Sequence, residues 1–298
     1  MIGMRAHDLA YGDIEVLSEK LAQFDKHTIQ LALFKSVTNL GLKDGAFSPG
    51  LARKIKQALD KNNISISVLG CYINPVCPDK QERKVQVNRF KEHIKYAKFL
   101  GADMIGTETG SVNLDGSFHE KNRSEENYQD FLSVMRELAE YARDLGVCIG
   151  IEAVSIFTIH SPQTMKRMLD DLNMPNIFVI FDPVNYLDDS NYKNQREIFQ
   201  TAFDLYGDRI AVVHLKDFTV ENGALKYALP TEGELDYAFL AKLLNDIVKG
   251  DKLMNPAKLL GTAKLLNEKK PYIPLLLEEV KEKDLNRITE RIKEVFGR

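Results

Sequence analysis

The sequence predicts an α/β fold, a (β/α)₈ TIM barrel, with a doubly wound open sheet as the alternative. Eight short apolar runs follow one another along the 298 residues, and amphipathic helices alternate with them. Ile210–Leu215 is apolar and largely β-branched, which is typical of a strand buried on both faces of a parallel sheet. Strands that alternate with helices over this length favour one right-handed barrel. No linker-like tract divides the chain, so we expect residues 1–298 to form a single domain.

The eight expected strands are the short apolar runs that alternate with the helices. They are Ile2–His7, Thr28–Phe34, Ile64–Cys71, Asp103–Thr107, Val147–Glu152, Ile177–Asp182, Ile210–Leu215 and Tyr272–Glu278.

Capping signals place the helices between these strands. A serine followed by proline predicts a helix start, and a glycine after an apolar position predicts a helix end. Ser124, with Asn127 three residues later, marks a further start. The expected helices run from Pro49 to about Lys61, from about Gln81 to Leu100, from Ser124 to Leu145, from Pro162 towards strand six, and over Arg196–Tyr206, Tyr237–Val248 and Leu285–Val295.

Two stretches exceed a minimal barrel. Thr219–Gly233 contains Glu221-Asn222-Gly223, which predicts a turn between two short extended pieces. Asp251–Lys270 has the pattern of an added helix before the last strand, and we consider it a candidate interface of a homo-oligomer.

Composition narrows the function. A net charge of −3 disfavours binding to a phosphate backbone, so we expect no nucleic-acid partner. Three cysteines, with no C-x-x-C spacing, argue against a disulfide framework or a cysteine zinc site and suit a reducing compartment. No basic-then-apolar leader and no apolar run of about 18 residues occurs, so we expect a cytoplasmic protein without a membrane partner.

Four polar residues close apolar runs where a barrel carries its active site, at the carboxyl ends of its strands. Glu152, Asp182, His214 and Glu278 end or nearly end the last four strands. Taken singly, such a carboxylate is usually a helix cap or loop anchor, and such a histidine a core residue. Three interior carboxylates on adjacent strands would repel one another without a cation between them. We therefore predict one shared divalent metal ion, Mn²⁺, Mg²⁺, Co²⁺ or Zn²⁺, with Mn²⁺ favoured.

The order and context of these four residues resemble the xylose-isomerase-like TIM-barrel superfamily of sugar isomerases and epimerases, which includes inosose dehydratase and is distantly related to class II AP endonucleases. HLKD at His214–Asp217 and TEGELDY at Thr231–Tyr237 fit the strand-seven region of that superfamily. Each motif is short, and their order along the chain carries the resemblance.

The resemblance implies that Glu152, Asp182, His214 and Glu278 bind one metal ion and that Glu152 and Glu278 act as the acid/base pair. A metal that bridges a carbonyl and a neighbouring hydroxyl oxygen acidifies the α-proton and stabilises an enediolate. Two carboxylates on opposite faces of the substrate then remove and return protons. The expected substrate is a small sugar, sugar phosphate or cyclitol.

The chain departs from the epimerase pattern at two places. Asn185 stands where the pattern often has a histidine, three residues after the strand-six aspartate. The arginine that some epimerases carry after the strand-seven histidine is missing, and Lys216 is a candidate replacement because strand alternation points it the same way as His214.

Five residues are candidate substrate contacts near the expected strand ends. They are His7, Tyr72, Glu108, Asn185 and Lys216. The alternative role is structural packing for His7, an ordinary turn for Tyr72 and loop capping for Glu108. Three other histidines, His27, His93 and His119, fall in helix or loop contexts and are expected to be exposed.

These observations support a metal-dependent sugar isomerase or epimerase. The alternative is an inosose dehydratase-like lyase that uses the same metal and base to expel a β-hydroxyl as water. A non-catalytic sugar-binding barrel would not need both glutamates. A DNA-repair nuclease is disfavoured because the chain has only six histidines and a nearly neutral charge.

Overall fold

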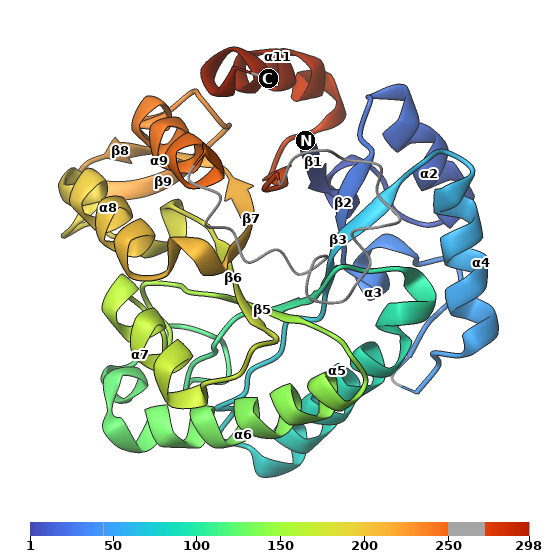
Figure 1. The fold of residues 1–298 in the computed structure, drawn as a ribbon, viewed down its shortest axis with the longest axis horizontal. Helices are drawn as coiled ribbons and strands as arrows, with labels where there is room; N and C mark the ends of the chain where they lie inside the picture. Colours follow the sequence, from blue (N-terminus) through green and yellow to red (C-terminus); the bar gives the residue numbers. More distant parts are fainter. Residues whose placement is uncertain (44, 250–271, 298) are drawn as a thin grey trace.

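Eight parallel strands form a closed barrel in the computed structural model, which describes residues 1–43, 45–249 and 272–297. Each strand pairs with its neighbours in chain order, and β10 closes the barrel against β1. Helices surround the barrel as a ring (Figure 1). The predicted TIM barrel is confirmed. Its strands are β1 (Ile2–Arg5), β2 (Thr28–Leu31), β3 (Ser65–Gly70), β4 (Ile105–Thr107), β5 (Ile149–Glu152), β6 (Ile177–Phe181), β7 (Ile210–Leu215) and β10 (Leu275–Leu277).

The α-helices between the strands begin mostly at side-chain caps. Ser48 and Ser161 each accept a backbone N–H of the turn that follows, with proline at the first helical position, and Ser124 accepts from Asn127 N. These starts confirm the capping predictions. The described α-helices are α1 (Ala6–Leu9), α2 (Ile14–Gln23), α3 (Leu33–Ser36), α4 (Pro49–Asp60), α5 (Lys80–Leu100), α6 (Glu125–Asp144), α7 (Pro162–Leu172), α8 (Gln195–Tyr206), α9 (Tyr237–Lys249) and α11 (Glu282–Phe296).

The first two predicted strands extend too far. His7 lies in α1 rather than at a strand end, and Phe34 lies in α3. Both short helices begin with apolar residues that continue the runs of β1 and β2, Ala6 in α1 and Leu33 in α3, so hydrophobicity alone does not separate strand from helix there. We predicted no element over α2, although Asp13 caps it and its buried residues Ile14, Leu17 and Leu21 have helical spacing. The expected helix Asp251–Lys270 lies outside the described residues.

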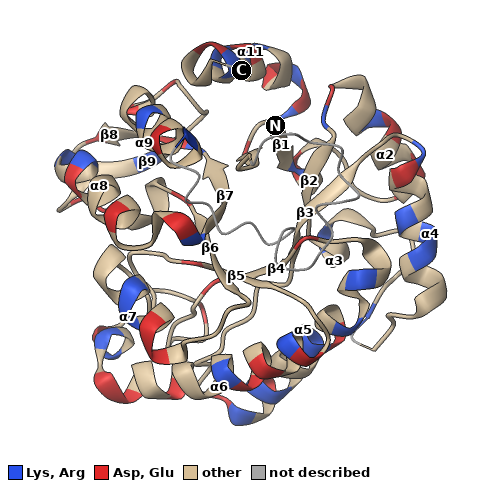
Figure 2. Ribbon diagram, viewed as in Figure 1, with Lys and Arg blue, Asp and Glu red and all other residues tan. Residues whose placement is uncertain are grey.

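The hairpin expected after strand seven is confirmed. β8 (Asp217–Glu221) and β9 (Ala224–Ala228) pair antiparallel, and Asn222 and Gly223 both have positive φ, as a type I′ turn requires. No helix in the described ranges is long and apolar enough to cross a membrane. Basic and acidic residues are interspersed along the outer helices (Figure 2), and some pair along one helix, such as Lys56 with Asp60.

The barrel interior is packed by a small apolar cluster that sets the direction of the side chains beyond it. Gly150 packs against this cluster. A Cβ at this position would lie only 2.7 Å from Met104 Sδ, so the packing favours glycine there. In a strand, residues two positions apart share a face, so the next inward positions fall at the carboxyl ends of the strands. The cluster includes Val68, Met104, Cys148, Phe178, Ile180, Val212 and Leu276.

Candidate metal centre

The alternation of side chains along the strands places the predicted polar residues together at one end of the barrel. Two positions beyond Ile180, Val212 and Leu276 of the interior cluster are Asp182, His214 and Glu278. Four positions beyond Cys148 is Glu152. All four side chains are buried, with exposed fractions between 0% and 5%. The packing of the interior cluster therefore determines the direction in which these four side chains point.

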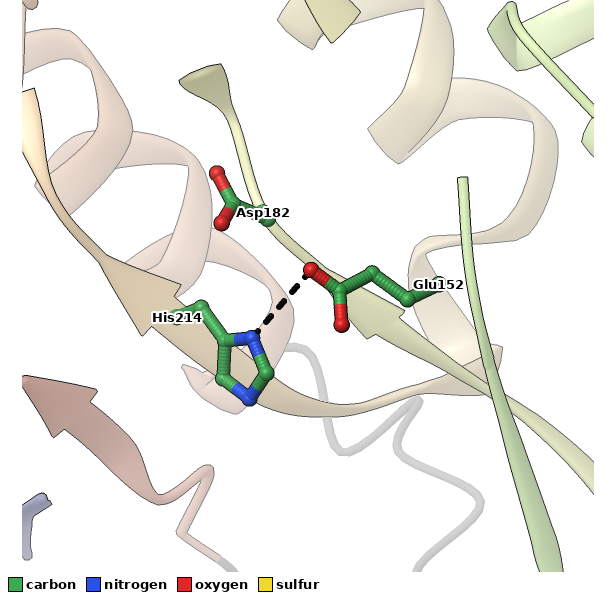
Figure 3. Close-up of side chains that lie close together, drawn as sticks. All are labelled: Glu152, Asp182 and His214. Atoms are coloured by element: carbon green, nitrogen blue, oxygen red, sulfur yellow. Dashed lines mark hydrogen bonds and ion pairs between the residues drawn. The ribbon is translucent and has the colours of Figure 1, made fainter. Parts of the chain in front are cut away.

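Three of these side chains converge from three adjacent strands. Ligand atoms of Glu152, Asp182 and His214 all lie within 4.8 Å of one another, and Figure 3 shows the three side chains close together, with the His214 ring beside the Glu152 carboxylate. The ring Nδ1 of His214 is 3.4 Å from Glu152 Oε1. The backbone N–H groups of Val184 and Asn185 donate to Asp182 Oδ1, which leaves Oδ2 to face the other side chains.

Glu278 lies beside this group. Its carboxylate is not part of the set within 4.8 Å, but its Oε1 is 3.2 Å from His214 Nδ1. His214 Nδ1 therefore contacts Glu152 and Glu278 at once. Burial alone would lower the pKa of His214, but the Glu278 and Glu152 carboxylates outweigh it and raise that pKa to about 9.

Lys216 adds a buried ammonium to the group. Its Nζ is 2.8 Å from Asp182 Oδ2 and 3.7 Å from Glu278 Oε2, and it donates a 2.7 Å hydrogen bond to Asn185 Oδ1. Burial raises the pKa of Asp182 to about 6, although the Lys216 ammonium opposes this. Burial also disfavours the Glu278 carboxylate, but His214 and Lys216 lower the pKa of that carboxyl to about 2.

The donor set fits a divalent cation. Carboxylate oxygens with one imidazole suit Mn²⁺, Mg²⁺, Co²⁺ or Zn²⁺. Ligands at about 2.1 Å from one ion lie about 3.0–3.4 Å from each other, and the two contacts of His214 Nδ1 fall in that range. Glu152, Asp182 and His214 are thus a group able to hold a metal ion, with Glu278 close enough to join it.

A cavity of about 390 Å³ opens beside the group, a size suited to a small molecule. Tyr72 lines it and donates a 3.0 Å hydrogen bond to Glu152 Oε2, and Asn185 Nδ2 donates a 2.7 Å hydrogen bond to Glu152 Oε1. Glu108 also lines it. Burial and the negative charge of Glu152 raise the pKa of Glu108 to about 8, so this carboxyl holds a proton at neutral pH.

All five predicted substrate contacts line this cavity, including His7 from its position in α1. The further lining residues that were not predicted include Arg5 and Gln30. Each is a polar residue inside an otherwise apolar run, MIGMRA for Arg5 and TIQLAL for Gln30. A polar residue in such a run is the sequence feature that could have indicated a place in the cavity. Arg5 and Gln30 are directly opposite each other in the β1–β2 pairing.

The sequence comparison decides the family. The family model described as xylose isomerase-like TIM barrel matches residues 19–250. The chain belongs to this family. No functionally curated protein matches the chain. Membership of the xylose isomerase-like family agrees with the resemblance inferred from the strand ends.

Solved structures share the fold of this xylose isomerase-like chain at low sequence identity. D-psicose 3-epimerase from Clostridium cellulolyticum H10 is 15% identical, with a TM-score of 0.66 and coverage of 99% of each chain. An IOLI protein with a bound zinc atom is 13% identical, with a TM-score of 0.69, covering 99% of this chain and 95% of that one. A xylose isomerase-like TIM barrel protein from Mycobacterium smegmatis in complex with magnesium is 15% identical, with a TM-score of 0.66, covering 99% and 92%.

Proposed function

We propose that this protein is a divalent-metal-dependent isomerase or epimerase of a sugar or sugar phosphate. The observation that carries the proposal is the convergence of Glu152, Asp182 and His214 within 4.8 Å, with Glu278 in contact with His214. Glu152, Asp182, His214 and Glu278 would hold the ion. A bound divalent cation would polarise a substrate carbonyl and stabilise the negative charge that develops on its oxygen.

Glu152 and Glu278 are the proposed acid/base pair. Both carboxylates line the cavity, so a substrate bound there lies within reach of two carboxylates. The low pKa of Glu278, about 2, keeps this carboxylate ionised at neutral pH, as a metal ligand must be. Tyr72 and Asn185 each donate to one oxygen of Glu152 and fix the orientation of that carboxylate.

Mn²⁺ is the metal we favour, since oxygen-rich ligation with one imidazole suits it. Neighbours of the same fold were solved with zinc and with magnesium, which supports a divalent ion without selecting one. The D-psicose 3-epimerase neighbour was solved with D-tagatose, which supports a small sugar as the substrate.

A lyase of the inosose dehydratase kind is the second candidate. Expulsion of a β-hydroxyl as water needs a proton donor besides the base that takes the α-proton. Glu108 is a third carboxyl on the cavity wall, and its pKa of about 8 keeps it protonated at neutral pH. This arrangement would serve a leaving hydroxyl.

Solvent exchange tests the proposal and separates the two candidates. The Mn²⁺-loaded protein is incubated in D₂O with D-fructose, D-tagatose, D-psicose or 2-keto-myo-inositol, and ¹H NMR follows the α-proton and the products. Isomerase activity gives deuterium at that carbon and an isomeric sugar, whereas lyase activity gives a dehydrated product.

Glu152→Gln and Glu278→Gln should each slow exchange by about 10²-fold or more. Glu140→Gln, the same change at an exposed position of α6, serves as the control. Exchange at the wild-type rate in both glutamate variants would contradict the two-carboxylate mechanism.

A further inference from the structure

Gln30, at the carboxyl end of β2, is a polar side chain with no assigned role. Its side chain is buried, with 2% exposure, and it lines the cavity beside the metal centre. Its Nε2 donates a 3.0 Å hydrogen bond to the hydroxyl of Tyr72. Tyr72 in turn donates to Glu152 Oε2.

This chain of hydrogen bonds fixes the orientation of the Gln30 amide. The Glu152 carboxylate accepts hydrogen bonds, so the single proton of the Tyr72 hydroxyl is used there. The hydroxyl oxygen of Tyr72 then needs a donor, and only the NH₂ side of the Gln30 amide can be one. The carbonyl Oε1 of Gln30 is consequently turned away from Tyr72.

The carbonyl Oε1 of Gln30 is a buried acceptor that finds no hydrogen-bond partner among the described residues. His7 Nδ1 is also buried and without a hydrogen-bond partner within the same ranges. Both residues line the cavity, from the neighbouring elements β2 and α1. Buried polar atoms without partners are costly, and sites that bind ligands are where proteins retain them.

Two of the cations that line the cavity are already engaged, and a third, Lys35, is exposed and has no ion-pair partner among the described residues. Arg5, opposite Gln30 in the strand pairing, donates twice to Asp8 and pairs with Glu279. Lys216 is held by Asp182 and Asn185. A phosphate or carboxylate group at Gln30 itself would still face an acceptor oxygen that has no proton to donate to it.

We propose that Gln30 and His7 form a hydroxyl-binding subsite, which selects a neutral polyhydroxylated substrate over its phosphate ester. Gln30 Oε1 can only accept, so its partner must donate, and a sugar hydroxyl donates whereas a phosphate dianion does not. A hydroxyl can also pair with His7 Nδ1. The inference rests on the proposed sugar chemistry of this cavity and narrows it to unphosphorylated substrates.

The subsite is connected to the proposed base. A hydroxyl bound at Gln30 would be linked through Tyr72 to Glu152, the carboxylate that we propose moves a proton. A substrate that satisfies Gln30 would be placed relative to Glu152 by this chain. Gln30 is therefore a specificity-determining residue in this proposal.

Calorimetry on the Mn²⁺-loaded full chain tests the subsite. The probes are D-fructose, D-tagatose, D-psicose and 2-keto-myo-inositol, with dihydroxyacetone as a ligand too short to carry a remote hydroxyl. At least one of the four should bind, and Gln30→Met should raise its Kd about tenfold or more, because it removes both the acceptor and the donor of Gln30. Dihydroxyacetone affinity should not change. Gln57→Met, on the exposed face of α4, is the matched control.

A second measurement needs no variant. The 6-phosphate of the sugar that binds best, or the monophosphate of the cyclitol, should bind the wild-type protein about tenfold more weakly than the parent compound. Tighter binding of the phosphate, wild-type affinity in Gln30→Met, or no binding of any of the four probes would overturn the proposal. Binding that depends on Gln30, without exchange of the α-proton in D₂O, would support the subsite while contradicting the proposed isomerase.

Discussion

Lys216 Nζ lies 2.8 Å from Asp182 Oδ2, the carboxylate oxygen that the backbone of the following loop leaves available. The same ammonium is 3.7 Å from Glu278 Oε2. A cation supplied by the chain itself therefore neutralises part of the negative charge of the candidate metal centre. A divalent ion held by Glu152, Asp182 and His214 would share Asp182 with Lys216.

Replacing Lys216 should make stability depend on the metal. Lys216→Gln leaves the buried Asp182 carboxylate without its counter-ion, which should lower the free energy of unfolding of the metal-free protein by about 3 kcal/mol. Removing a positive charge beside the ligands should also tighten Mn²⁺ binding. Thermal unfolding with and without Mn²⁺ measures both effects.

The increase in Tm on adding Mn²⁺ should be larger in Lys216→Gln than in the wild type. Lys35→Gln is the control, because Lys35 lines the same cavity but is exposed. Equal increases in the wild type and both variants would show that Lys216 does not act on the metal centre.

Asp217, the last residue of the HLKD motif, has a structural role. Its carboxylate accepts backbone N–H groups of Phe218, Gly233 and Leu235, so it joins β8 to the segment that leads into α9. Asp217→Ala should lower the free energy of unfolding by about 2 kcal/mol, because buried donors lose their acceptor. Urea denaturation measures this.

The affinity of folded Asp217→Ala for Mn²⁺ should match that of the wild type. Asp115→Ala, in an exposed loop, should change neither quantity. Loss of metal binding in folded Asp217→Ala would mean that this carboxylate belongs to the metal centre.

Lys26 predicts a pH dependence of stability. Its side chain is buried, with 1% exposure, and donates to Thr289 Oγ1, and burial lowers its pKa to about 8 from 10.5. The folded state binds the Lys26 proton less tightly than the unfolded state does. The free energy of unfolding therefore rises with pH between about pH 8 and pH 10.5. Below about pH 8 the buried ammonium destabilises the folded state to its full extent.

Lys26→Met should therefore be the more stable protein at pH 7, by on the order of 2 kcal/mol. Its advantage should shrink as the pH approaches 10.5. Lys283→Met, which removes an exposed lysine on α11, is the control, and urea denaturation at both pH values is the measurement. An advantage that is constant with pH would refute the assignment to Lys26.

Much of the fold could be predicted because its signals are local. Apolar runs predicted all eight barrel strands. Serine and proline at helix starts predicted where α4, α6 and α7 begin. The candidate site could be predicted from strand alternation. A side chain at a strand end points to the same face as the residues two and four positions before it.

Features that depend on packing between distant segments were not visible. His93 was expected to be exposed, but it is buried on α5 with its ring edge against Phe47. Gln30 gains its significance only from Tyr72 and Glu152, which other strands supply. Lys26 is buried because α11 covers it, a contact between the two ends of the chain.

Metal stoichiometry of the purified protein tests the central claim most directly. After incubation with Mn²⁺ and removal of free ion, elemental analysis should find about one ion per chain in the wild type, because the proposed ligands converge on a single site. Asp182→Ala and His214→Ala should each abolish it. No bound ion in the wild type after incubation with Mn²⁺, Co²⁺, Mg²⁺ and Zn²⁺ in turn, or undiminished binding in both variants, would contradict the account.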